Sequence, residues 1–250
     1  MSSEIFHAIL WLLLVFLFTS SGAAVACLFS DRAINYIFTY ISGFSGGIMI
    51  AASVWSLLIP AMETSSYSEE ISLALAVGGF ALGAAFMFVV SKFLPEEENP
   101  ARGSFKRLFI AVTAHNIPEG LAVDFAFGGV AFGKLPLAAA LAVALGIGIQ
   151  NFPEGAAVSM PARKVFGKGK AFLYGAASGA VEPIAGLIGF VAVGIVSEIL
   201  PVSMAFAAGA MVFATISDVL PGALNKNAIQ TSAGFSVGFI LMMTLDVLFG

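Results

Sequence analysis

Long apolar runs take up almost the whole chain, and they constrain its fold more than any other feature of the sequence. Each run has about 20 residues or more, the length that an α-helix needs to cross the hydrocarbon core of a bilayer. Of the 250 residues, 59% are hydrophobic and only 10% are charged, where a soluble domain carries about 25% charged residues. This composition excludes an ordinary soluble enzyme and predicts an all-α integral membrane protein. The runs predict eight transmembrane helices, near residues 5–28, 36–60, 71–94, 106–128, 135–160, 170–197, 201–222 and 228–249.

The basic residues predict how these helices are oriented. Of the 11 lysines and arginines, all but Lys134 lie in or beside the odd-numbered connections. Because cytoplasmic loops carry an excess of Lys and Arg, the odd connections are expected to be cytoplasmic and both termini outside. No basic residue precedes the first run, which is also too long for the apolar part of a signal peptide, so we expect a retained helix. The connections are short, the longest being 95–107, which predicts a single transmembrane domain over residues 1–250.

Two of the runs resemble each other. When 36–60 is aligned with 201–222, Gly47 and Met49 fall on Gly209 and Met211, and a proline follows in each run. Coincidence among small apolar residues is one explanation. The other is an inverted repeat, because the two runs are predicted to cross the membrane in opposite directions and many transporters are built in this way. An inverted repeat would place three helices on either side of a central pair, a 3+2+3 arrangement.

The central pair of runs carries one motif twice. The fourth run reads HNIPEG from His115 to Gly120, and the fifth reads QNFPEG from Gln150 to Gly155. A carboxylate in the middle of a transmembrane helix costs about 2.5–3.5 kcal/mol, so the glutamate of each copy needs a neutralising partner. Glu182 in the sixth run has the same need. No Lys or Arg lies deep in any run, so the partner is a proton, a bound cation or both.

The residue types of the motif favour a transition metal. Helical spacing places His115 and Gln150 one turn before Glu119 and Glu154, on the same face of each helix. Each motif proline removes a backbone N–H, frees a carbonyl one turn earlier and is expected to kink its helix there. One imidazole with carboxylates and amide oxygens suits Zn²⁺, and after it Fe²⁺, Mn²⁺, Co²⁺ or Cd²⁺, better than Ca²⁺ or Mg²⁺. The thioether of Met49 is either a further ligand or core packing.

Other polar residues of the runs have more than one interpretation. The acids Glu63, Asp124, Asp218 and Asp246 either line the path of an ion or are solvated residues at helix ends. We expect three serines to bond to carbonyls of their own helices: Ser53, Ser56 and Ser178. The single cysteine, Cys27, forms no intrachain disulfide, and only two histidines, His7 and His115, are present, which excludes Cys/His zinc modules.

The paired motif resembles the signature of the ZIP (Zrt/Irt-like) family of divalent metal transporters. The glutamine that leads the second copy, and Val181-Glu182-Pro183 in the sixth run, resemble the prokaryotic GufA-like branch. The resemblance implies eight helices in a 3+2+3 inverted repeat, outside termini and a homodimer. It also implies a binuclear site. One metal would be held by Met49, His115, Glu119, Gln150 and Glu154, and the second by Asn116, Glu119, Asn151, Glu154 and Glu182.

The resemblance implies a secondary transporter that moves a divalent metal ion into the cytoplasm by an elevator-like motion of helices 1, 4, 5 and 6 against 2, 3, 7 and 8. We expect no enzymatic activity, no cofactor other than the transported ion and no nucleic-acid partner; the partners are metal ions, the lipid bilayer and a second copy. The absence of targeting segments and the compact size favour a bacterial inner membrane. The alternatives are a divalent-cation channel, a metal-sensing membrane protein, which would need an output domain, and an intramembrane metalloprotease, which would need a second histidine.

Overall fold

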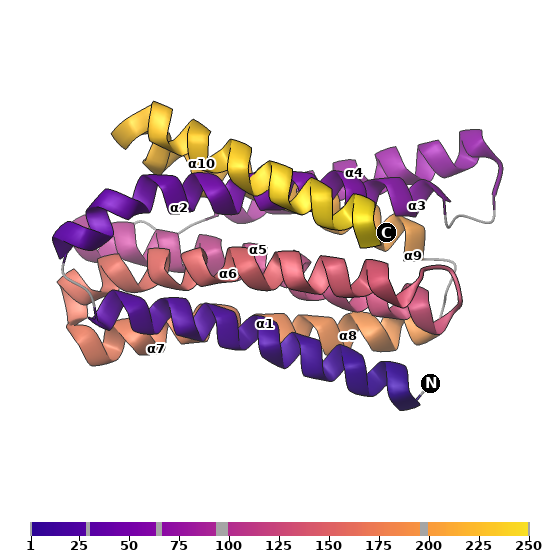
Figure 1. Ribbon diagram of the computed structural model, residues 1–250, viewed down its shortest axis with the longest axis horizontal. Coiled ribbons are helices and arrows are strands. Elements are labelled where there is room, and N and C mark those ends of the chain that lie inside the picture. Colours follow the sequence, from indigo (N-terminus) through magenta and orange to yellow (C-terminus); the bar gives the residue numbers. More distant parts are fainter. Residues whose placement is uncertain (1, 29–30, 64–66, 94–99, 196–199, 250) are drawn as a thin grey trace.

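The chain folds into long helices that lie roughly side by side (Figure 1). This is a computed structural model, and it describes residues 2–28, 31–63, 67–93, 100–195 and 200–249. These residues are almost entirely helical and include no strand, which confirms the all-α prediction. Four runs form single helices: α1 (Ser2–Leu28), α4 (Glu69–Lys92), α5 (Pro100–Ala131) and α6 (Leu137–Phe166).

The remaining runs are composite. α2 (Asp31–Ala51) continues through a π-helical segment, η1 (Ala52–Leu58), into the short α3 (Ile59–Glu63). α7 (Lys168–Gly179) and α8 (Val181–Ile195) follow each other with only Ala180 between them. α9 (Leu200–Ala214) continues through a second π-helical segment, η3 (Thr215–Val219), into α10 (Leu220–Phe249).

α10 bends sharply at Asn227, whose backbone is extended (φ −159°, ψ 97°). The Oδ1 atom of Asn227 accepts a hydrogen bond from the Gln230 N–H at 3.1 Å, which caps the part of α10 that follows. The bend separates 220–226 from 228–249, and it therefore falls between the last two predicted runs.

The connections are shorter than the sequence indicates. α5 already begins at Pro100, a residue that suits the first position of a helix, so Arg102 and Lys106 are helical and do not belong to a 95–107 loop. Between α6 and α7 the chain turns at Gly167 alone, with a φ of 81° that glycine adopts without steric cost.

The two π-helical segments fall at matching positions of the predicted repeat. Aligning Gly47 with Gly209 places η1 against residues 214–220, and η3 spans 215–219. In each segment a hydroxyl donates to the methionine carbonyl one turn earlier: Ser53 to Met49 and Thr215 to Met211, both at 2.7 Å. The similarity of the two runs therefore extends to their local structure. The complete 3+2+3 arrangement stays a prediction.

Two groups of helices make up the molecule. α2 packs mainly on α10 and α4 on α9, while α1 packs mainly on α6 and α7, and α5 on α8. In Figure 1, α2, α4 and α10 lie in the upper part and α1, α7 and α8 in the lower part. A shared core of buried side chains joins the groups. It includes Met49, Leu57, Phe127, Ile147, Met204 and Met242.

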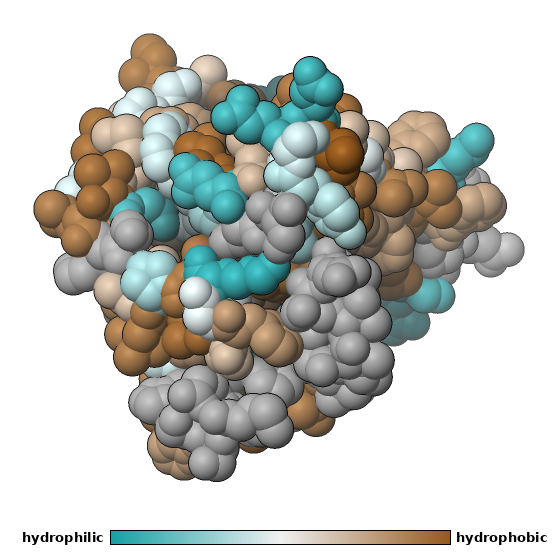
Figure 2. All heavy atoms as spheres, turned by 90° about the vertical axis from the view of Figure 1, so that its right-hand side faces the viewer, coloured by the Kyte–Doolittle hydropathy of each residue, from teal (hydrophilic) through white to brown (hydrophobic). Residues whose placement is uncertain are grey.

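The outer faces of the helices are strongly apolar. Large hydrophobic side chains are exposed on several helices, among them Leu17 on α1, Leu82 on α4 and Ile188 on α8. Within the described residues, five helical stretches are long and apolar enough to cross a membrane: Phe38–Glu63, Glu69–Lys92, Leu137–Phe166, Lys168–Gly189 and Leu200–Leu248. The end-on view of Figure 2 shows hydrophilic residues gathered on the end facing the viewer and hydrophobic residues along the flanks.

α1 begins and α10 ends at the same end of the bundle (Figure 1). The number of membrane spans and the side on which the termini lie stay predictions.

Candidate metal centre

The duplicated motif lies inside the bundle, where α5 and α6 pack against each other and against α1 and α8. The described motif side chains that could bind a cation are all buried, as is Glu182. Their exposed fractions are 4% for Glu154 and 0% for Asn116, Glu119, Gln150, Asn151 and Glu182. α5 and α6 stay helical through the motif prolines, Pro118 and Pro153. The polar side chains that the sequence singled out therefore share one buried region.

Glu182 reaches this region because the helix breaks just before it. Pro183 has no N–H to offer the carbonyl of Gly179, so the helical hydrogen bonding is interrupted one turn before the proline. α7 accordingly ends at Gly179 and α8 begins at Val181. Glu182 then lies in the first turn of α8, where the partial positive charge of the helix N-terminus stabilises a carboxylate.

The glycine that ends each motif copy allows a neighbouring backbone to come close. A Cβ on Gly120 would overlap the carbonyl oxygen of Glu182, and a Cβ on Gly155 would overlap that of Thr19. Only glycine fits at such contacts, because any side chain would push the helices apart. The two copies of the motif thus bring α5 onto α8 and α6 onto α1 in the same manner.

Amide side chains of the motif donate to the glutamates. The Nε2 atom of Gln150 donates to Oε1 of Glu119 at 2.6 Å, which joins α6 to α5. The Nδ2 atom of Asn116 donates to Oε1 of Glu182 at 3.1 Å and to the carbonyl of Ser178 at 2.9 Å. Asn151 lies beside Glu182 as well. Each predicted amide therefore lies at or next to the carboxylates.

Two hydroxyls that the sequence did not single out complete these contacts. Thr19 on α1 donates to Oε1 of Glu182 at 3.2 Å, and Ser45 on α2 donates to Oε1 of Glu154 at 3.0 Å. Isolated Ser and Thr in apolar helices usually bond to their own backbone, so the sequence offered no signal that would distinguish these two.

The centre is acidic and keeps acceptor oxygens free. Glu119 lies close enough to Glu154 and Glu182 for their charges to interact, and no described lysine or arginine acts on Glu119 or Glu182. Five buried oxygens of the centre have no hydrogen-bond donor among the described residues: Oε2 of Glu119, Oε2 of Glu182, Oδ1 of Asn116, Oε1 of Gln150 and Oδ1 of Asn151. Buried acceptors that lack a donor are costly, and a bound cation would satisfy them.

The other two predicted ligands differ in what the structure says of them. His115 belongs to α5, one turn before Glu119, but its side chain lies outside the described part of the chain. Met49 is fully buried, and its sulfur accepts a hydrogen bond from Thr215 at 3.5 Å. No described contact joins Met49 to the glutamates. Without His115, the described His, Cys, Asp and Glu side chains form no cluster of three or more that meets the geometry of a metal site.

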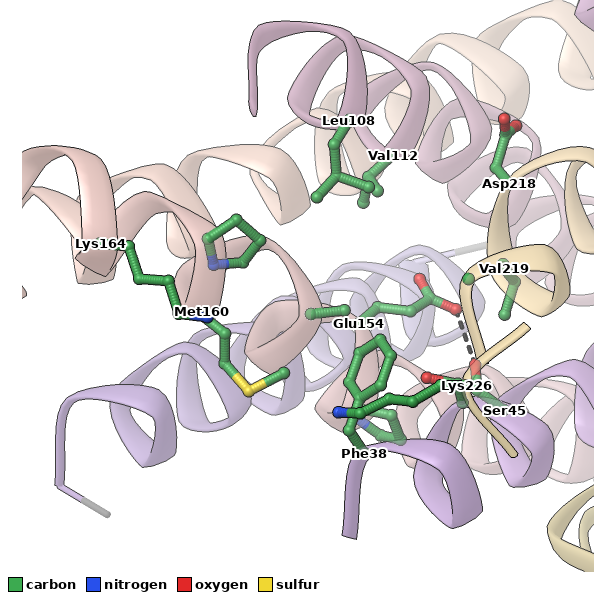
Figure 3. A pocket seen from close by; sticks show the side chains of 15 residues that line it. Phe38, Ser45, Leu108, Val112, Glu154, Met160, Lys164, Asp218, Val219 and Lys226 are labelled. Atoms are coloured by element: carbon green, nitrogen blue, oxygen red, sulfur yellow. Dashed lines mark hydrogen bonds between the residues drawn. The ribbon is translucent and has the colours of Figure 1, made fainter. Parts of the chain in front are cut away.

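A cavity of about 370 Å³ leads to Glu154 from one end of the bundle. In Figure 3 the Glu154 carboxylate lies next to Ser45, with the apolar side chains of Leu108 and Val112 across the cavity and Asp218 on its far side. Lys164 and Lys226 also line it. The cavity extends from Glu154 toward the end of the bundle where α6 ends.

A second cavity, of about 310 Å³, lies toward the opposite end of α6. Glu63, Lys134 and Asp246 line it. Asp246 accepts a hydrogen bond from Ser56 at 2.5 Å, so the prediction that Ser56 bonds to its own helix is wrong. The same prediction is confirmed for Ser53 and for Ser178, which donates to the Gly175 carbonyl.

The structure shows the surroundings of the four acids outside the motif, which the sequence left with two interpretations. Glu63 and Asp246 line the second cavity and Asp218 the first. Asp124 and Asp246 are 1% and 8% exposed, so neither is a solvated residue at a helix end.

A bundle of apolar helices that encloses carboxylates and amides in its interior defines a class of protein, the multi-pass membrane protein with a polar centre. Comparison with known proteins gives the family. The chain is 34% identical to the zinc transporter ZIP11 of Xenopus tropicalis and 33% identical to that of Homo sapiens, in each case over 98% of both chains. It is 35% identical to the zinc transporter GufA of Myxococcus xanthus, over 83% of this chain and 85% of that protein.

The chain belongs to the ZIP family, and the similarity to GufA agrees with the GufA-like branch that the motif indicated. No protein-family model matches the chain. The relatives are named transporters and not enzymes, in agreement with the prediction.

Proposed function

We propose that the chain is a secondary transporter that carries divalent transition metal ions, Zn²⁺ first among them, into the cytoplasm. The observation that carries the proposal is the buried set of Glu119, Glu154 and Glu182, held by neutral amides and hydroxyls. The names of the relatives support zinc as the cargo. Fe²⁺, Mn²⁺, Co²⁺ and Cd²⁺ are further candidates, because a mixed nitrogen and oxygen ligand set does not select among them by affinity alone.

The proposed site is binuclear, with the ligand sets that the family resemblance implies. Glu119 and Glu182 each use one carboxylate oxygen in a hydrogen bond and keep the other for a metal. Gln150 points its N–H toward Glu119, so it would turn its amide to present Oε1 to the ion. Met49 would have to exchange its contact with Thr215 for the metal.

In the proposed orientation both termini lie outside and eight helices cross the membrane, so the cavity that contains Lys164 and Lys226 opens to the cytoplasm. Metal bound at Glu154 would leave through it. α1, α5, α6, α7 and α8 would move as one body against α2, α3, α4, α9 and α10, the two groups that pack most closely within themselves. The metal gradient and the membrane potential, about 2.3 kcal/mol per charge per 100 mV, would drive the movement. We further propose that the protein forms a homodimer and lies in a bacterial inner membrane.

Metal uptake into proteoliposomes tests this function. We expect saturable uptake of Zn²⁺ and Cd²⁺ but not of Ca²⁺ or Mg²⁺, and we expect Glu119→Gln to abolish it. Glu70→Gln is the matched control, because Glu70 is an exposed carboxylate at the start of α4. Uptake that does not saturate would indicate a channel. Zinc binding with no flux in either protein would indicate a sensor.

A further inference from the structure

Asp124 is a buried carboxylate that the proposed metal site does not use. It lies on α5 beyond Glu119, toward the end of the helix at Ala131. Its side chain is 1% exposed, and neither of its carboxylate oxygens has a hydrogen-bond donor among the described residues. A buried acid without a hydrogen-bond donor needs something to neutralise its charge, because an unpaired charge inside a protein costs free energy.

The described surroundings of Asp124 are apolar. Gly189 of α8 faces it so closely that a Cβ there would lie 3.3 Å from Oδ2 of Asp124. The same Cβ would also contact Leu121 and Phe125 of α5. The carboxylate therefore lies in the interface between α5 and α8, against a small residue and hydrophobic side chains.

No described charge compensates Asp124. No described acid or base lies close enough for its charge to affect the Asp124 carboxyl group, which is influenced only by its burial. The ionisable residues nearest to it along α5 and α8, Glu119 and Glu182, belong to the metal centre, and α9 has none. The ionisable residues of α6 and α7 lie at Glu154 or beyond it toward the Gly167 turn, and those of α1, Glu4 and His7, lie outside the described side chains.

The chemistry of the surroundings selects the neutralising cation. A metal ion needs about four or more ligands, and one carboxylate among apolar side chains does not supply them. A proton needs a single oxygen. We propose that Asp124 is a proton-binding site, a carboxylic acid inside the interface of α5 and α8 that is separate from the metal centre and that titrates during the transport cycle.

The second part of this proposal rests on the proposed function. If α5 and α8 carry the metal across the membrane, a neutral Asp124 travels with them at little cost, whereas an ionised one opposes the movement. Ionisation of Asp124 would therefore lower uptake at alkaline pH. Wild-type uptake should fall as the pH rises through the range in which Asp124 loses its proton.

Infrared spectroscopy of the purified protein tests the proton site without any transport. At neutral pH we expect wild type to show the carbonyl band of a protonated carboxylic acid, and we expect Asp124→Asn to lose one such band. The amide of Asn resembles a neutral acid in shape, and Asp124→Ser provides a second, smaller neutral side chain. Glu70→Gln is the control, and its spectrum in this region should equal that of wild type. A spectrum that neither Asp124 variant changes would overturn the proposal.

Zinc uptake as a function of pH tests the role in transport. Asp124→Asn should keep its uptake at alkaline pH, where wild type loses it. An alkaline loss that is the same in both proteins would overturn this role. If wild type shows no uptake at any pH, the proposed function fails, and the infrared result still decides whether Asp124 binds a proton.

Discussion

The described donors to the carboxylates of the candidate metal centre are neutral side chains. Glu119 accepts from Gln150, Glu154 from Ser45, and Glu182 from Asn116 and Thr19. A lysine or arginine in these positions would fix the carboxylates more strongly, but it would also supply the positive charge that a metal ion is meant to bring. Amides and hydroxyls orient the acids and leave the negative charge available. At the scale of the residue, the centre is suited to a cation that arrives and leaves.

His115 provides a test of metal selectivity. We expect His115→Ala to weaken the transport of Zn²⁺ more than that of Mn²⁺, because imidazole contributes more to zinc than to manganese. Competition between the two metals in proteoliposome uptake measures the difference. Gln150→Ala serves as the comparison, since it removes an amide oxygen and should affect both metals alike. Equal losses of the two metals in His115→Ala would argue against direct ligation by the imidazole.

The residues of the centre could be predicted only in part. Buried glutamates and their motif partners stand out in the sequence because acids and amides are rare inside apolar runs. Thr19 and Ser45 could not be predicted, because hydroxyls are common in such runs and their partners lie on other helices. Asp124 had two interpretations from its position, and only the packing of α8 against it shows that it is buried.

At the scale of the element, hydropathy predicts where helices lie and hydrogen bonding decides how they are interrupted. Each predicted run coincides with helical elements, since burial in lipid requires that backbone groups bond within the segment. The break at Ala180 follows from Pro183, so it could have been predicted from the sequence. The π-helical segments η1 and η3 could not have been predicted, because a widened helical turn depends on local packing and has no signature in the composition.

Gly120 tests how closely α5 and α8 must pack. Gly120→Ala forces a Cβ onto the carbonyl of Glu182, so we expect a loss of about 1–3 kcal/mol in the free energy of unfolding, as for other overpacked sites. Gly78→Ala is the control, because Gly78 lies on α4 with nothing near it, and alanine favours the helix by about 1 kcal/mol. The thermal midpoints of both variants in detergent report the difference. Equal stability of Gly120→Ala and wild type would show that the interface tolerates separation.

At the scale of the whole molecule, the positions of the charges and of the two cavities indicate the same orientation of the bundle in the membrane. Most basic residues belong to the end of the bundle where α6 ends and α7 begins, the end to which the cavity at Glu154 leads. The positive-inside rule predicts that this end faces the cytoplasm. The second cavity, with Glu63 and Asp246, would then face outward and collect cations from that side.

Cysteine labelling tests this orientation. In a Cys27→Ser background, we place a cysteine at the exposed Phe132, between α5 and α6, or at Gly169, at the start of α7. A maleimide that does not cross membranes should label position 132 in intact cells and position 169 only after the cells are permeabilised. The reverse pattern would invert the predicted topology and with it the proposed direction of transport.

Alternation between the two cavities is the last requirement of the proposed mechanism, and α6 offers a matched pair of positions to detect it. Ala157 lines the cavity at Glu154 and Ala139 the opposite one, so Ala157→Cys and Ala139→Cys report on the two ends of one helix. If α6 moves with the metal, any condition that shifts the balance of conformations must change the two labelling rates in opposite directions. We expect added Zn²⁺ to produce such opposite changes in the Cys27→Ser background. Glu119→Gln should remove them, because a ligand shifts an equilibrium only through its different affinities for the two states. Parallel changes at both positions would instead describe a pore that opens at both ends together, as in a channel.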